Sequence, residues 1–218
     1  MEMIKVTTAP FMDEATRAAL ASGRAEPALG LFLDVLMAMR GISEIEGEAI
    51  AGAALEAEAP TAMKPDALAM AFAAIDRGDQ RKPGPKAMTY PELEAVPVAL
   101  RDVICSAESK RSWSYGGPGL KRLDLGVPGG AKIEVIRLAA GTSVPWHTHK
   151  GQELTLCLHG EFSDGHATYG PGDFSAFDGA TRHQPRTDKD TVAYALAVTD
   201  AGLRFEGVLG ALQKMFGQ

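Results

Sequence analysis

One short stretch constrains this chain more than any other: two histidines spaced two positions apart, followed four residues later by a glutamate. His147 and His149 leave the same face of an extended strand, because side chains alternate between its two faces. Glu153 opens an alternating run, 153–158, that predicts a barrel strand with a carboxylate at its start. Donors packed this closely call for a cation, and His183 supplies a fourth. The sequence therefore predicts a metal site.

The spacing of these residues resembles the first motif of the cupin family, in which a glycine precedes two histidines, a glutamate and a second glycine. Gly141, His147, His149, Glu153 and Gly160 match that motif at every fixed position. The resemblance implies an all-β barrel of the jelly-roll type with a metal site.

The second cupin motif is matched only in part. Gly172 and His183 stand at the expected positions, whereas Asp178 replaces a proline, Ala180 a glycine and Arg186 an asparagine. The histidine ligand is present although the turn residues differ. Together the two motifs predict four metal ligands: His147, His149, Glu153 and His183.

A donor set of three imidazoles and one carboxylate narrows the range of possible metals but does not identify one. Zinc, iron, manganese, nickel and cobalt all accept such a donor set. Zinc held by four protein ligands forms a closed site of structural or sensory type. A six-coordinate metal keeps the open positions that a dioxygenase or hydrolase needs. We assign no catalytic residue.

The first 80 residues are predicted to form a small helical bundle. Pro27 suits the first turn of a helix that ends at Gly41, and Ser43 with Glu46 forms a capping box for the next helix. Apolar residues cover almost the whole circumference of the helix over 27–40, which indicates either the centre of the bundle or a surface for another chain. The predicted helices span 13–21, 27–40, 43–58 and 65–78.

A linker and a β-rich part follow. Residues 81–98 combine Pro, Gly and charge at a density that resists both helix and sheet, and from residue 99 the periodicity changes to two. Residues 207–217 predict a short closing helix. We therefore predict a two-domain α + β chain: a helical domain over 1–80, a linker over 81–98 and a cupin barrel over 99–218. The predicted strands are 132–139, 153–158, 162–169, 173–177 and 191–198.

Charge and cysteine content constrain the partners and the compartment. Residues 1–80 carry 6 Lys and Arg against 13 Asp and Glu, a net −7, and residues 81–218 carry 16 against 15, a net +1. The acidic part disfavours direct nucleic-acid binding and favours a basic protein partner. The chain shows neither a signal-peptide pattern nor an apolar run long enough for a membrane span. We expect a cytoplasmic protein in which Cys105 and Cys157 stay reduced.

An acidic helical module, a Pro-rich linker and a C-terminal cupin together resemble the ChrR-type anti-sigma factors. The stretches 147–156, 169–173 and 197–205 are similar to the corresponding stretches of that family. The resemblance implies that the helical domain binds a sigma factor of the extracytoplasmic-function type. It also implies that the cupin domain is needed for release on an oxidative signal such as singlet oxygen. It favours zinc over iron, manganese or nickel.

One departure from that family concerns a second metal site. The helical domain of the family usually holds its own zinc ion through a His, three residues, Cys, two residues, Cys pattern. The best register of this pattern falls on Leu33, Met37 and Arg40, and no histidine precedes His147. We therefore expect no N-terminal zinc and helices held by packing alone.

Two functions of different classes fit these observations. The first is a regulatory protein, an anti-sigma factor whose cupin metal site senses the signal. The second is a cupin metalloenzyme of the dioxygenase type that acts on a small molecule and uses its N-terminal helices to form a homodimer. A cupin that binds a sugar or metabolite without turnover is a third reading. The resemblance favours the regulatory protein over an enzyme.

Overall fold

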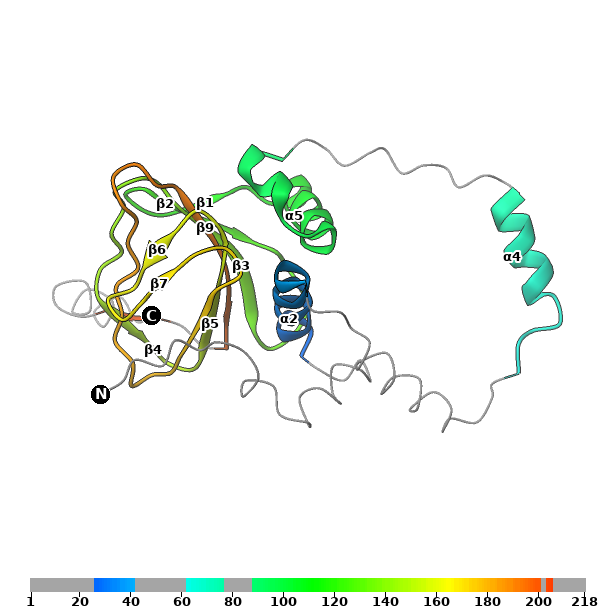
Figure 1. Cartoon of the computed structure of the whole chain (residues 1–218). Helices are drawn as coiled ribbons and strands as arrows, with labels where there is room; N and C mark the ends of the chain where they lie inside the picture. Colours follow the sequence, from blue (N-terminus) through cyan, green and yellow to red (C-terminus); the bar gives the residue numbers. More distant parts are fainter. Residues whose placement is uncertain (1–25, 42–61, 77–87, 201–202, 206–218) are drawn as a thin grey trace.

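The centre of the protein is an antiparallel β-barrel with helices against one side (Figure 1). The computed structural model describes residues 26–41, 62–76, 88–200 and 203–205. The strands are β1 (Ser114–Gly117), β2 (Leu120–Asp124), β3 (Lys132–Leu138), β4 (His147–His149), β5 (Glu153–His159), β6 (Phe162–Ser163), β7 (Thr168–Tyr169), β8 (Phe174–Phe177), β9 (Ala193–Thr199) and β10 (Leu203–Phe205). One sheet has the order β1-β2-β3-β9-β5-β8, and two short pairs, β10-β4 and β6-β7, complete the barrel.

The first described helix begins and ends where the sequence predicts. This helix, α2 (Pro27–Arg40), is capped by the Glu26 carboxylate, which accepts from the backbone N–H groups of Ala28 (2.9 Å) and Leu29 (3.1 Å). Gly41 ends it in the left-handed conformation with φ 62°, which glycine adopts without strain. The predicted helices over 13–21 and 43–58 lie outside the described residues.

Helix α2 packs on the barrel. Its buried side chains share one apolar core with α5 (Val98–Lys110) and with the outer face of the large sheet. The ring of Phe32 meets the ring of Phe174 on β8 edge to face, at 6.2 Å between centroids. Among the described residues, the partners of α2 are therefore α5 and the sheet. The buried residues of α2 are Ala28, Phe32, Leu33, Val35 and Leu36.

Helix α4 (Ala67–Asp76) is the other described part of the N-terminal region, and it lies within the predicted span 65–78. It stands away from the barrel in Figure 1. Leu68 and Phe72, one helical turn apart, are 62% and 57% exposed. This helix therefore offers an apolar face to solvent in the described part of the chain.

The segment before the first strand differs from the prediction. A 3-10 helix, η1 (Pro91–Ala95), and α5 occupy residues where we predicted a linker and then strands. Leu100, Ile104 and Ala107 are buried at helical spacing, so this stripe outweighs the strand periodicity that we assigned from residue 99. Leu93 of η1 is also fully buried. Part of the predicted linker thus belongs to the core around the barrel.

The strand predictions hold for most of the barrel. Strands β3, β5, β8 and β9 fall on predicted segments, and the predicted strand over 162–169 is divided into β6 and β7 by the turn at Asp164-Gly165. Strands β1, β2 and β10 were not predicted, and β4 is the extended segment on which His147 and His149 were expected to share a face. The predicted helix over 207–217 lies outside the described residues. Within the part of the chain that the structure describes, no helix has the length and apolar character needed to cross a membrane.

Candidate metal centre

Three of the four predicted ligands come from one corner of the barrel, where β4 leads into β5. Strand β4 holds His147 and His149 on the same face, and Glu153 begins β5. His183 comes from the segment after β8, and its backbone exchanges two hydrogen bonds with that of His147, at 3.1 and 3.0 Å. This isolated bridge brings a residue that is distant in sequence beside β4.

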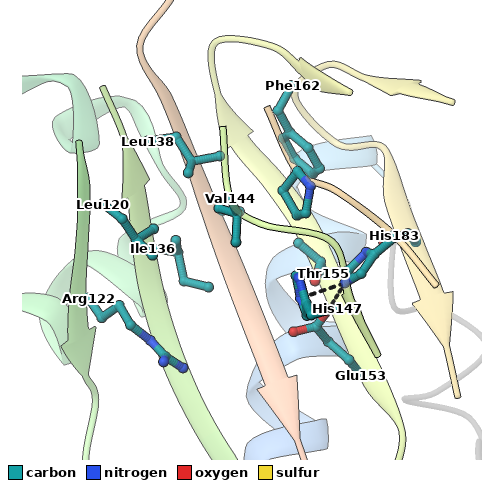
Figure 2. A pocket seen from close by; sticks show the side chains of 13 residues that line it. Leu120, Arg122, Ile136, Leu138, Val144, His147, Glu153, Thr155, Phe162 and His183 are labelled. Carbon is teal, nitrogen blue, oxygen red and sulfur yellow. Dashed lines mark hydrogen bonds and ion pairs between the residues drawn. The ribbon is translucent and has the colours of Figure 1, made fainter. Parts of the chain in front are cut away.

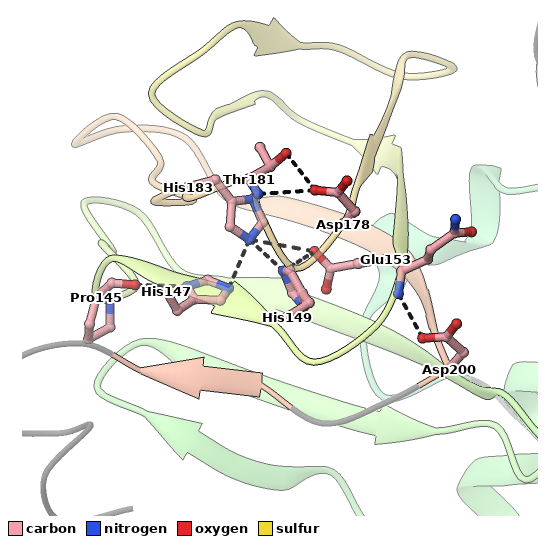
Figure 3. A network of polar contacts seen from close by, with 9 residues as sticks. Pro145, His147, His149, Glu153, Asp178, Thr181, His183 and Asp200 are labelled. Atoms are coloured by element: carbon pink, nitrogen blue, oxygen red, sulfur yellow. Dashed lines mark hydrogen bonds and ion pairs between the residues drawn. The ribbon is translucent and has the colours of Figure 1, made fainter.

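The four side chains converge on one buried point, as Figure 3 shows. The Nε2 atom of His183 lies 2.9 Å from the Nε2 atom of His147 and 2.9 Å from that of His149. The Oε2 atom of Glu153 lies 3.1 Å from His149 Nε2 and 3.6 Å from His183 Nε2. The structure thus brings together every residue that the two motifs predict, with three imidazole nitrogens within 4.8 Å of one another.

Protons do not satisfy this cluster while the Glu153 carboxylate is ionised. His147 Nδ1 is 2.8 Å from the Pro145 carbonyl oxygen, which assigns the proton to Nδ1 and leaves Nε2 as an acceptor. His183 Nε2 must then carry a proton to donate to His147. If His149 Nε2 also carries a proton, its N–H group faces that of His183 at 2.9 Å; if it carries a lone pair, that lone pair faces the carboxylate at 3.1 Å. With neutral imidazoles and an ionised Glu153, two like groups therefore remain in contact, and a bound cation would resolve this conflict.

The electrostatic environment favours neutral histidines and an ionised glutamate, which are the forms that bind a metal ion. Burial lowers the pKa of His147, and burial together with the neighbouring histidines lowers the pKa of His183 to about 4. Burial raises the pKa of Glu153, but the hydrogen bond with His149 and the three nearby imidazoles bring that pKa below its ordinary value. At neutral pH, His147 and His183 are therefore uncharged and the carboxylate is ionised, which is the state of ligands ready to bind a cation.

A cavity that opens to solvent adjoins this centre. Figure 2 shows His147, Glu153 and His183 on one side of it and the strands β2 and β3 on the other. Its lining is mainly apolar, and Arg122 of β2 is the cation that faces it. Arg122 was not predicted as a site residue, because β2 is a short strand whose alternation of Leu120, Arg122 and Asp124 is a weak signal.

Cys157 lies inside the barrel and does not belong to the metal cluster. Its thiol is fully buried, and its Sγ atom is 3.8 Å from the His159 carbonyl oxygen. Burial raises the pKa of this thiol to about 12, so it stays protonated and unreactive at neutral pH. The two cysteines, Cys105 and Cys157, are not bridged.

The sequence and the fold of this chain are both similar to those of known proteins. The sequence profile of the ChrR cupin-like domain matches residues 101–200. The anti-sigma-E factor ChrR of Cereibacter sphaeroides is 33% identical over 169 residues, which cover 78% of each chain. The crystal structure of Rhodobacter sphaeroides SigE in complex with the anti-sigma ChrR matches with a TM-score of 0.60 at 24% identity, covering 87% of this chain and 97% of that chain. At this identity the structural match supports the fold.

Proposed function

This chain belongs to the ChrR family, and we propose on that basis that it is an anti-sigma factor that binds and inhibits a sigma factor of the extracytoplasmic-function type. The observation that carries the proposal is the extent of the similarity. The aligned 169 residues exceed the 120 residues from 99 to 218, so the alignment includes at least 49 residues before the predicted cupin domain. The similarity to a protein named as an anti-sigma factor thus extends into the region to which we assign sigma binding.

The exposed helix α4 supports the same proposal. Met63, Leu68, Met70 and Phe72 are 57–78% exposed, which is unusual for so many large apolar side chains within ten residues. An amphipathic or apolar helix that lies in a groove of its partner presents such side chains. We assign α4 to the sigma-binding surface, within a helical domain over 1–80 that is joined through the segment 81–98 to a cupin domain over 99–218.

We also propose that the cupin domain holds one metal ion, through His147, His149, Glu153 and His183. Zinc is the first candidate, with iron, manganese and nickel as alternatives. When bound, such an ion would link β4, β5 and the segment after β8, and it would supply a site at which an oxidative signal is sensed. The support comes from the cluster itself, because with Glu153 ionised no distribution of protons on neutral imidazoles satisfies all of its contacts.

The helical part needs no zinc ion of its own in this proposal. Leu33, Met37 and Arg40 stand where the family pattern has zinc ligands. Leu33 is buried in the core that α2 shares with the barrel, and the Arg40 guanidinium donates from Nε to the Gly172 carbonyl oxygen at 2.8 Å. Packing against the cupin domain therefore stabilises α2 in place of a metal.

The test of this function is co-expression of the tagged full-length chain with the sigma factor encoded beside it in the genome. A stable complex that withdraws the sigma factor from core polymerase, and thereby blocks transcription from its promoter, is the expected result. Recovery of the chain alone, with transcription unaffected by its addition, would refute the proposal. A cytoplasmic location follows from this function, because the sigma factor acts there.

A cupin metalloenzyme that acts on a small molecule remains the second candidate, because the cavity adjoins the proposed metal centre. In that case the metal would keep an open coordination position toward the cavity, and the helices would serve a homodimer. X-ray absorption spectroscopy separates the two: four protein donors without a solvent ligand favour the regulator, and five or six ligands that include water favour the enzyme.

A further inference from the structure

The cavity beside the proposed metal centre exists because the middle of the sheet carries small side chains. Ala193, Ala195 and Ala197 alternate along β9 with the large residues Tyr194 and Leu196. Tyr194 and Leu196 pack outward in the core that contains α2 and α5, so the alanines face the inside of the barrel. Ala195 lines the cavity itself. The small side chain of Ala195 on the central strand therefore leaves an unfilled space across the barrel.

The walls around this space are apolar on the side away from the histidines. Leu120 of β2 pairs with Leu138 of β3, and Ile136 of β3 pairs with Ala195 of β9. Phe162 adds an aromatic ring to the lining. Figure 2 shows it on the side of His183, across the space from Leu120 and Ile136. A ligand that fills the space must therefore present an alkyl or similar apolar surface over most of its length.

One cation interrupts this apolar wall. Arg122 lies across from Ile136 and lines the cavity. Its Nη2 atom pairs with the Glu134 carboxylate, which also pairs with Lys132 at 2.5 Å. Two cations thus share the Glu134 carboxylate, although the Lys132 side chain is about half exposed. The other carboxylate that lines the cavity, Glu153, would be neutralised by the proposed metal ion. The buried Nε–H group of Arg122 has no hydrogen-bond partner among the residues that the structure describes.

We propose that this cavity binds a short aliphatic monocarboxylate, with its carboxylate at Arg122 and its alkyl chain against Leu120, Ile136 and Leu138. The cation with a spare donor selects an anionic oxygen head, and the surrounding apolar wall selects a hydrocarbon tail. The ligand lies between Arg122 and the proposed metal centre, so its presence changes what the metal site contacts. Its role as a regulatory signal rests on the proposed anti-sigma function, whereas binding itself does not.

Isothermal titration calorimetry of the full-length, metal-replete protein with hexanoate tests the proposal. We expect saturable binding of one hexanoate per chain and weaker binding of hexanol, which has the same tail without the charge. Absence of saturable hexanoate binding would overturn the proposal. Binding of hexanol as tight as that of hexanoate would overturn the assignment of a carboxylate ligand.

Two variants locate the ligand. The double variant Arg122→Met/Glu134→Gln removes both partners of the buried pair, so that neither charge is left alone, and it should weaken hexanoate binding at least about tenfold. Ala195→Leu fills the space and should weaken hexanoate and hexanol alike. Arg137→Met is the matched control, because Arg137 donates to the Tyr194 hydroxyl on the outer face of the same strands. Unchanged affinity in the double variant, or an equal loss in Arg137→Met, would contradict the assignment.

Assays of hexanoate binding and of sigma-complex formation on the same protein preparation test the ligand site and the anti-sigma function separately. A chain that forms the sigma complex and binds no hexanoate refutes the ligand alone. A chain that binds hexanoate through Arg122 and forms no sigma complex refutes the anti-sigma function and leaves the ligand site in place.

Discussion

Phe32 of α2 and Phe174 of β8 join the N-terminal part of the chain to the barrel. Their rings meet edge to face at 83°, and Phe32 is fully buried. Three residues beyond Phe174, at the other end of the same strand, the Phe177 ring lies 4.7 Å from the His183 ring. Strand β8 therefore contacts α2 at one end and the proposed metal centre at the other, which offers a short route between the two parts.

The first prediction concerns the Phe32–Phe174 contact. Phe32→Ala should lower the free energy of unfolding by about 3–5 kcal/mol, because it leaves a cavity between α2 and the sheet. Phe72→Ala on the exposed helix α4 is the matched control and should change stability by no more than about 0.5 kcal/mol. Urea titration followed by circular dichroism measures both. Equal stability of the two variants would show that α2 does not depend on this contact.

The second prediction concerns the end of α2. Arg40→Met removes the hydrogen bond to the Gly172 carbonyl oxygen and the contact of the guanidinium with the Phe174 ring at 5.4 Å. We expect a loss of about 1–2 kcal/mol and faster amide exchange in 27–40. Arg40→Lys restores only the charge and should recover part of the stability. Unchanged exchange in Arg40→Met would contradict the proposed anchor.

The third prediction concerns the surface that binds the sigma factor. Leu68→Glu/Phe72→Glu places two charges on the exposed face of α4 and should abolish co-purification of the sigma factor, with the melting temperature unchanged. Tyr115→Glu introduces a charge at a 76% exposed position on β1 and should leave the complex intact. Full retention of the complex by the α4 variant would exclude this helix from the interface.

The fourth prediction concerns the pH dependence of thiol reactivity. Burial raises the pKa of Cys157 to about 12, so the thiolate fraction at pH 8 is roughly one in ten thousand. Iodoacetamide at pH 8 should therefore modify Cys105, which is partly exposed, well before Cys157. Mass spectrometry should detect labelling of Cys157 only after denaturant is added. Rapid labelling of Cys157 in the folded chain would mean that its thiol is accessible and ionised.

Local sequence spacing was enough to predict three of the four donors. His147, His149 and Glu153 lie within seven residues, so the geometry of one strand corner already holds them together. His183 is distant in sequence, and it was found only because a second motif resembled that of a known family. The backbone bridge that brings it to His147 forms between segments whose pairing no local pattern encodes.

The partner of α2 could not be predicted in this way. Its apolar circumference indicated burial, but the residues that bury it, such as Phe174 and Ile104, come from β8 and α5. Helix α5 was also not predicted. We assigned the two-residue periodicity of strands from residue 99 onward and overlooked the helical spacing of Leu100, Ile104 and Ala107. The cavity depends on the small side chain of Ala195 on β9. A small residue in a strand predicts a cavity only once the strands that face it are known.

The most direct test of the account is the metal content of the purified chain, measured by inductively coupled plasma mass spectrometry. We predict one metal ion per chain, with zinc expected, and less than about a tenth of that in His183→Ala, because a missing ligand leaves an incomplete site. His159→Ala is the control, because the His159 ring packs near Tyr194 at 6.0 Å and lies outside the cluster. A metal-free wild-type chain, or equal metal in His183→Ala and the wild type, would contradict the account.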